Sequence, residues 1–334
     1  MKIAVIGAGA IGGLVAGYLK QAGHEVNLVC RKAAAEAISR QGLRISGVRG
    51  NLNVTVDVSE RMQGVPELAI AATKTQDVAS AIRENIDFLK GVPFLTTQNG
   101  VRADAIAAGL LDREKIISSI VMFGATSLKP GEVVHNFEGV WLIGSPFGET
   151  DRFIAQLGSI LDVVSPTMIS PDLSGMKYLK VFVNASNCLP ALLGTTIQEA
   201  FKDRRISAIS IAVWREGMEI VRAAGIELAS LPDFPLERIT RLLSLPLAEA
   251  AGIFSGIMTG LSAEPLYGSV LQSIKRGKPS EIDYINGEFV NLAREHGLKS
   301  PLNEKLVAMV HRVEREGRFF TSDEVLENVK ELVT

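Results

Sequence analysis

Apolar residues follow two different periods along the chain, and the change comes near residue 168. Before it, short β-branched runs that suit buried strands alternate with amphipathic segments of helical period. After it, long helical segments dominate. Because alternating strands and helices are typical of a parallel, doubly wound sheet, we predict an α/β domain over residues 1–168 and an all-α domain over 169–334 that meets it across a cleft.

The individual elements are predicted from these periods. In the first half, strands are expected over 2–6, 25–30, 68–73, 93–100 and 115–125, with helices over about 10–22 and 75–89. Residues 132–137 and 140–144 are separated by Glu138 and Gly139, which predicts a hairpin at the sheet edge with a structural His135. In the second half, helices are expected over about 172–193, 203–224, 233–243, 247–259, 266–276, 281–297 and 302–316.

Composition narrows the class of protein. The chain has 334 residues, 47% of them hydrophobic, and a net charge of −2, which favours neither nonspecific nucleic-acid binding nor a basic membrane patch. Two cysteines, Cys30 and Cys188, indicate a reducing compartment, so we expect a cytoplasmic protein. The first 20 residues loosely resemble a signal peptide, but their regularly placed glycines argue against export. No apolar run is long enough to predict a transmembrane helix.

A glycine-rich turn follows the first predicted strand. Gly7, Gly9 and Gly12 have the G-x-G-x-x-G spacing between a strand and a helix, which is typical of a Rossmann-type dinucleotide site. The helix N-terminus would present free N–H groups and partial positive charge to phosphates. The predicted cofactor loop consists of Gly7, Ala8, Gly9, Ala10, Ile11 and Gly12.

The end of the second strand favours NADPH over NADH. NAD-binding proteins usually place a carboxylate there, whereas this chain has Cys30, Arg31 and Lys32. A guanidinium can bind a 2′-phosphate through two hydrogen bonds, although Arg31 and Lys32 could also be two solvated cations. Lys74 and Asn99 follow two further strands, where the ligand crevice of such a sheet lies.

One predicted helix of the second half carries polar residues at helical spacing. Lys180, Asn184 and Asn187 stand at offsets of zero, four and seven within "YLKVFVNASN", on one stripe of an α-helix. The stripe either faces water or lines a site, because buried polar groups need partners. An exposed lysine on an amphipathic helix would look the same, but asparagine inside a helix needs a reason.

These motifs together resemble the ketopantoate reductase (2-dehydropantoate 2-reductase) family, whose members act in pantothenate biosynthesis. The resemblance rests on "KIAVIGAGAIGG", "TKTQ", "TQNG", "KVFVN" and "SVLQSIKRGKPSEIDYING". It implies that Lys180 is the general acid, that Glu281 belongs to the catalytic and cofactor sites, and that Arg31, Lys74 and Asn99 lie on the cofactor side. It further implies that Asn184 and Ser269 bind the substrate. To these we add Asn99 and Asn187 as predicted substrate-binding residues, although Asn187 stands one residue before the position where the family pattern has an asparagine.

Three residues depart from the family pattern at the substrate end. Cys188, Leu266 and Ser273 stand where polar or acidic residues are common, and a less polar pocket discriminates substrates less well. Ketopantoate and another branched 2-oxo acid therefore both stay open as substrates.

The chemistry agrees with the resemblance. A hydride delivered to a ketone leaves negative charge on oxygen, and an ammonium can stabilise that charge and supply the proton. Burial lowers the pKa of a lysine, and Glu281 would counter that. The alternatives are a related 3-hydroxyacid dehydrogenase and a non-catalytic NADPH-binding sensor. No metal site is predicted, and apolar helical segments such as "ISIAVW" would suit a homodimer.

Overall fold

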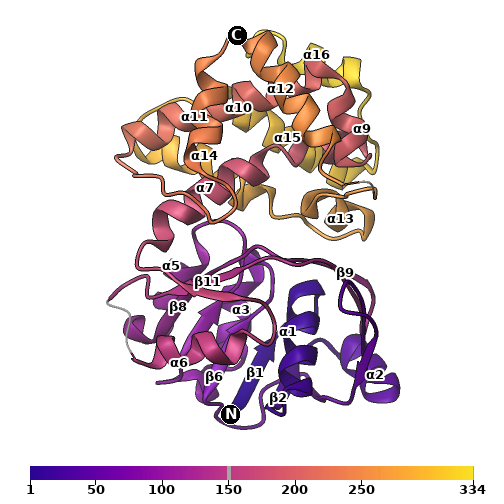
Figure 1. Cartoon of the computed structure of the whole chain (residues 1–334), viewed down its shortest axis with the longest axis vertical. Helices are drawn as coiled ribbons and strands as arrows, with labels where there is room; N and C mark the ends of the chain where they lie inside the picture. Colours follow the sequence, from indigo (N-terminus) through magenta and orange to yellow (C-terminus); the bar gives the residue numbers. More distant parts are fainter. Residues whose placement is uncertain (149–151, 263, 334) are drawn as a thin grey trace. The chain divides into compact units, whose positions relative to one another are not determined.

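The computed structural model describes residues 1–148, 152–262 and 264–333. Its contacts divide the chain into two compact units (Figure 1). Unit 1 comprises Met1–Gln98 and Arg102–Leu173, and unit 2 comprises Asn99–Val101 and Ser174–Thr334. The predicted fold class is confirmed, since unit 1 is built of strands and helices and unit 2 is helical.

A mostly parallel sheet forms the centre of unit 1, with the strand order β12-β11-β8-β7-β6-β1-β2-β5. β1 lies between β2 and β6 and is parallel to both, while β11 is antiparallel to β8. From β1 the chain continues to β2 and β5 on one side and then to β6, β7 and β8 on the other, so the strand order changes direction at β1. In open α/β sheets, ligands bind at the carboxyl ends of the strands next to such a change. The strands are β1 (Lys2–Ile6), β2 (Glu25–Val29), β5 (Asp57–Ser59), β6 (Leu68–Ala71), β7 (Phe94–Thr96), β8 (Ile116–Val121), β11 (Trp141–Gly144) and β12 (Thr167–Ile169).

Both faces of this sheet are covered by helices. Successive side chains of a strand point to opposite faces, so Ile3 and Val5 join one apolar core while Ala4 and Ile6 join another. The first core includes residues of α1 and α6, and the second includes residues of α3 and α5. The helical elements of unit 1 are α1 (Ala10–Gln21), α2 (Lys32–Gln41), η1 (Thr75–Asp77), α3 (Val78–Glu84), α4 (Ile86–Leu89), α5 (Ala103–Ala108), η2 (Arg113–Lys115) and α6 (Arg152–Leu161).

The predicted hairpin of residues 132–137 and 140–144 is wrong. Its two strands belong to different sheets, because β10 pairs with β3 and β9 whereas β11 pairs with β8 and β12. Every residue of β11 is buried, as a strand covered on both faces requires, while β10 alternates between buried and more exposed residues. The smaller sheet, ordered β4-β3-β10-β9, consists of β3 (Leu43–Gly47), β4 (Leu52–Val54), β9 (Gly124–Lys129) and β10 (Glu132–Phe137).

Unit 2 packs its helices around α10 and a cluster of aromatic rings. The rings of Trp214 and Phe254 lie 5.2 Å apart, and the Trp214 indole Nε1 donates a hydrogen bond of 2.7 Å to the carbonyl of Phe182. The helical elements are α7 (Leu173–Ala185), α8 (Cys188–Leu193), α9 (Ile197–Lys202), α10 (Arg204–Ala223), α11 (Leu236–Ser244), α12 (Leu247–Thr259), α13 (Ser269–Lys275), η3 (Ile282–Tyr284), α14 (Asn286–Glu295), α15 (Pro301–Glu316) and α16 (Ser322–Val329).

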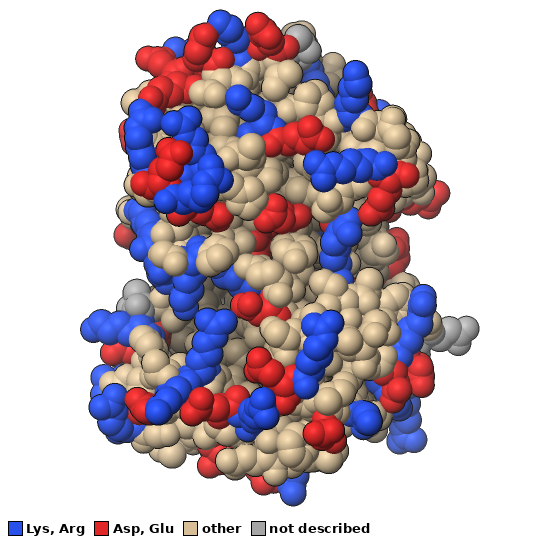
Figure 2. Space-filling model, turned by 180° about the vertical axis from the view of Figure 1, so that it is seen from behind, with Lys and Arg blue, Asp and Glu red and all other residues tan. Residues whose placement is uncertain are grey.

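Acidic and basic side chains are interspersed over the face shown in Figure 2, without a large area of one sign. Within the described ranges, none of the helices combines the length and the apolar character needed to cross a bilayer.

Candidate active site

The glycine loop begins where the central strand of unit 1 ends. Gly7 has a φ of 112°, and an added Cβ would lie 2.8 Å from the carbonyl carbon of Ala72. A larger residue is therefore excluded both by the backbone conformation and by the lack of space. A Cβ on Gly12 would collide with the carbonyl oxygen of Gly7. A Cβ on Gly9 would meet nothing within 4 Å, so the loop is open at Gly9, the N-cap of α1. This combination fits a phosphate group at the helix N-terminus.

Arg31 follows β2 and is the N-cap of α2. Its side chain is 87% exposed and lies 4.0 Å from the Asp77 carboxylate, a weak pairing that leaves the guanidinium open to solvent. Glu60, which no sequence motif singled out, follows β5 beside the end of β2. Burial and the charge of Glu60 raise the pKa of the Cys30 thiol to about 11. A cation and a carboxylate therefore both lie near the end of β2.

Gln98 fixes the loop that carries Lys74. The Gln98 side-chain amide donates hydrogen bonds of 2.9 Å and 3.0 Å to the carbonyls of Ala71 and Thr73. Lys74 directly follows Thr73 and is the N-cap of η1. Since β1, β2 and β6 are parallel neighbours, the glycine loop, Arg31 and Lys74 all stand at the same edge of the sheet.

The electrostatic centre of unit 2 is Lys180 on α7. Burial and the neighbouring charge of Lys177 lower the pKa of Lys180 to about 8, while the charge of Glu281 acts in the opposite direction. Lys180 and Glu281 therefore lie close enough for the charge of Glu281 to act on the Lys180 ammonium. Lys177, which is only 5% exposed, was missed by the sequence analysis. Its position one helical turn before Lys180 was the available signal, because residues three apart share a helix face.

The predicted helix over 172–193 is two helices. α7 ends at Ala185 and α8 begins at Cys188, with Asn187 as the N-cap of α8. Pro190 explains the break, because it lacks the N–H that would bond to residue 186. Asn184 therefore lies on the helix of Lys180, one turn further on, and Asn187 lies beyond its end.

Asn187 and Ser269 lie near each other at the start of α13. A Cβ added to Gly268, the N-cap of α13, would be 3.2 Å from the Asn187 side chain, and Ser269 is the next residue. Ser269 is exposed. Of the three departures from the family pattern, Cys188 and Ser273 are buried and Leu266 is half-buried.

Asn99 is the first residue of the short segment Asn99–Val101, which belongs to unit 2 although the residues on either side of it belong to unit 1. At the next residue, Gly100, φ is +84° and an added Cβ would collide with the carbonyl oxygen of Tyr284. Tyr284 ends η3, three residues after Glu281. Asn99 thus stands next to the segment that carries Glu281.

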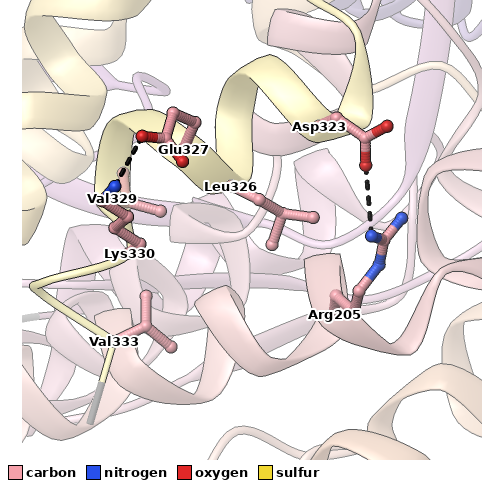
Figure 3. Close-up of a pocket in the computed structure, with 7 residues that line it drawn as sticks. All are labelled: Arg205, Asp323, Leu326, Glu327, Val329, Lys330 and Val333. Atoms are coloured by element: carbon pink, nitrogen blue, oxygen red, sulfur yellow. Dashed lines mark hydrogen bonds and ion pairs between the residues drawn. The ribbon is translucent and has the colours of Figure 1, made fainter.

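Two pockets in the described chain contain none of these residues. One, of 320 Å³, lies between α10 and α16, and its charged side chains pair with one another: Arg205 with Asp323 at 3.1 Å and Lys330 with Glu327 at 2.6 Å (Figure 3). The other, of 470 Å³, lies on the smaller sheet of unit 1 and is lined by Arg44, Ile45, Ser46, Asn51, Leu52, Asn53, Glu132 and Val133.

Known proteins are similar to this chain in sequence and in fold. The chain is 30% identical to the 2-dehydropantoate 2-reductase of Pyrococcus horikoshii, over 95% of this chain and 99% of the relative. A PanE/ApbA family ketopantoate reductase from Ralstonia eutropha has a similar structure, with a TM-score of 0.80 and 27% identity, covering 95% of this chain and 99% of that one. A D-mandelate dehydrogenase bound to NADH, 22% identical over 95% of this chain and 99% of its own, has the same fold, with a TM-score of 0.79.

Two family models match almost consecutive parts of the chain. Residues 3–146 match the model described as ketopantoate reductase PanE/ApbA, and residues 172–314 match its C-terminal counterpart. Together they cover most of both units. The chain therefore belongs to the PanE/ApbA ketopantoate reductase family.

Proposed function

We propose that this protein reduces 2-dehydropantoate to pantoate with NADPH, and that Lys180 is the general acid. Membership of the family implies an oxidoreductase with a nicotinamide cofactor. The observation that carries the proposal is the half-buried Lys180, with a pKa of about 8 and with Glu281 close enough to act on it. A general acid is most effective when its pKa lies near the working pH.

Some of these residues would bind the cofactor or the substrate, and Lys180 would transfer the proton. The loop Gly7–Gly12 would hold the pyrophosphate, and Arg31 and Lys74 would bind the remaining phosphate charge. When bound, NADPH supplies the hydride to the 2-oxo carbon. The ammonium of Lys180 stabilises the developing alkoxide and gives it a proton, so that the product is a 2-hydroxy acid and the lysine is left neutral. Asn99, Asn184, Asn187 and Ser269 would orient the substrate.

The test is an assay of the purified protein with a panel of 2-oxo acids and both nicotinamides. We expect oxidation of NADPH with 2-dehydropantoate at a higher kcat/KM than with an unbranched or an aromatic 2-oxo acid. A preference for another acid would reassign the substrate. No turnover with any of them, despite NADPH binding, would favour the non-catalytic sensor.

Two substitutions of Lys180 separate its roles. Lys180→Ala should lower kcat by about 10²–10⁴-fold, the usual contribution of a general acid, while the Kd for NADPH stays within about twofold. Lys180→Arg keeps the positive charge but cannot release a proton near neutral pH, so it should recover only part of the loss. Normal turnover in Lys180→Ala would disprove the assignment.

The choice of NADPH depends on Arg31 and is tested by its removal. Arg31→Ala should raise the Kd for NADPH about tenfold or more and leave the Kd for NADH nearly unchanged, because only NADPH carries the 2′-phosphate. Glu60 provides the matched control, since a carboxylate at this edge would repel that phosphate and could hold a ribose hydroxyl. If Glu60→Ala weakens NADH and Arg31→Ala affects both cofactors equally, NADH is the cofactor.

A further inference from the structure

Residues 280–284 form a turn that carries Glu281 and is bound to α15 at two points. The Glu314 carboxylate accepts a hydrogen bond of 2.8 Å from the backbone N–H of Ser280 and also bonds to the Ser280 hydroxyl. His311 Nε2 lies 2.9 Å from an oxygen of Asp283. Because these two contacts flank Glu281 on either side, α15 constrains the backbone from which the Glu281 side chain extends.

His311 also joins the two contacts into one network. Its Nδ1 lies 3.0 Å from the second oxygen of Glu314, so each ring nitrogen faces a carboxylate. Carboxylates only accept hydrogen bonds, and a neutral imidazole has one N–H. Both contacts are therefore hydrogen bonds only when His311 is an imidazolium. The charges that act on it come from Asp283 on η3 and Glu314 on α15.

The turn is linked to the other polar residues of the candidate active site. The charge of Glu281 acts on Lys180, and the backbone of Gly100, next to Asn99, lies against the carbonyl of Tyr284 at the end of the turn. A shift of the turn would move Glu281 relative to Lys180 and disturb the support of Asn99.

We propose that His311 and Glu314 are positioning residues: the imidazolium of His311, held by Glu314, fixes the 280–284 turn and thereby sets the position of Glu281 relative to Lys180. The proposal rests on the proposed function of Lys180 and Glu281. We assign His311 and Glu314 no contact with substrate or cofactor, because their hydrogen bonds are to each other and to the turn. Their effect follows from the sensitivity of catalysis to geometry, since a displacement of about 1 Å can cost 10²-fold in rate.

The first test is kinetic and uses His311→Ala, with Arg315→Ala as the control. Arg315 is an exposed residue of the same helix, one turn beyond His311. We expect His311→Ala to lower kcat by about 10- to 100-fold and to leave the Kd for NADPH within about twofold. Arg315→Ala should change neither. A kcat for His311→Ala equal to that of the control would overturn the proposal.

The second test needs no turnover. Amide hydrogen exchange at Ser280 and Ile282 should become at least about tenfold faster in His311→Ala than in Arg315→Ala. In the wild type, this protection should fall as pH rises and His311 loses its proton, and the variant should lack that dependence. NMR of ¹⁵N-labelled lysine amines, assigned with Lys180→Arg, should show a lower Lys180 pKa in His311→Ala, because Glu281 no longer supports the charged form.

His311→Gln guards against a folding defect. Its amide N–H can still bond to Asp283 but does not titrate, so protection of the turn should return without the pH dependence. Unchanged exchange and an unchanged Lys180 pKa in His311→Ala would overturn the positioning role. Faster exchange and a lower Lys180 pKa in a protein that reduces no 2-oxo acid would uphold the positioning role and reject the proposed function.

Discussion

Lys177 and Lys180 place two ammonium groups one turn apart on α7, an arrangement that disfavours the charged form of Lys180. Lys177→Met removes one charge and keeps an unbranched side chain at the buried position. The Lys180 pKa should then rise above about 8, because the second-largest cause of its depression is gone. The alkaline limb of the kcat/KM profile should move to higher pH by the same amount.

Lys202→Met is the matched control for this shift. Lys202 lies in the same unit and forms an exposed ion pair with Glu199. It should leave the pH profile unchanged, because exposed charges are screened by solvent. An alkaline limb that stays in place in Lys177→Met, or moves to lower pH, would show that Lys177 does not act on the general acid.

The sequence could name Lys180 and Glu281 as candidates but could not supply their environment. Their motifs mark them, and an ammonium beside a carboxylate makes chemical sense at a reducing site. The burial of Lys177, the carboxylate of Glu60 beside β2 and the anchoring of Asp283 by His311 all depend on segments that are distant in sequence. Such pairings leave no periodic signal in a single sequence.

At the scale of elements, α15 takes its N-terminal cap from another helix. Ser300 occupies the N-cap position, but its hydroxyl bonds to Glu304 and makes no capping bond. The free N–H groups of Leu302 and Asn303 instead donate to the Glu216 carboxylate of α10, each at 2.9 Å. α15 therefore depends on α10 both for its apolar contacts and for its first turn.

Removing this cap should destabilise unit 2. Glu216→Ala leaves two backbone donors without their partner, and we expect it to lower the free energy of unfolding by about 2–3 kcal/mol. Glu219→Ala removes an exposed carboxylate from the same helix and should change it by less than about 0.5 kcal/mol. Urea unfolding followed by circular dichroism measures both variants. Equal midpoints for the two would mean that water replaces Glu216 without loss.

Element boundaries show where a single sequence is informative. The helix predicted over about 247–259 has the limits of α12, which follows Pro246 and ends before Gly260, two residues that mark helix ends in a sequence. The break between α7 and α8 could have been anticipated from Pro190. The strand predicted over 115–125 instead contains the whole of β8 and the start of β9, and only the pairing of β9 with the smaller sheet separates them.

At the scale of the whole chain, the change of period identified the fold class, because buried parallel strands and amphipathic helices differ in spacing everywhere along their length. The sheet to which each strand belongs could not be predicted from the sequence. Residues 132–137 and 140–144 are neighbours in sequence and read as partners, yet each finds its apolar neighbours in a different sheet. Which strands pair is decided by packing across the unit, so local pattern predicted the class but not the topology.

His135 in unit 1 and His311 in unit 2 should give opposite pH dependences to the structure around them. In unit 1, His135 is fully buried, with its Nδ1 3.1 Å from the Tyr18 hydroxyl, and burial lowers its pKa despite the nearby Glu138. In unit 2, burial of His311 is outweighed by its hydrogen bonds to Asp283 and Glu314, which raise its pKa. Histidine in an unfolded chain titrates near 6.5, between these two folded values.

The sign follows from which state binds the proton more tightly. As pH falls below about 6.5, the unfolded chain gains a proton that His135 resists, so unit 1 loses stability toward acid. The contribution of His311 is complete below about 6.5 and is lost as pH rises through its raised pKa, so the protection that His311 gives to α15 weakens toward alkali. The lowered pKa of Lys180 acts on unit 2 in the opposite direction, so comparison with His311→Gln isolates the effect of the histidine. Amide exchange, corrected for intrinsic rates and compared at about pH 5 and about pH 8.5, should therefore show weaker protection of β1 and β10 in acid and of α15 in alkali. His311→Gln should abolish the alkaline change in α15 and leave the acid change in unit 1 intact; if it alters both units equally, the two histidines do not act locally.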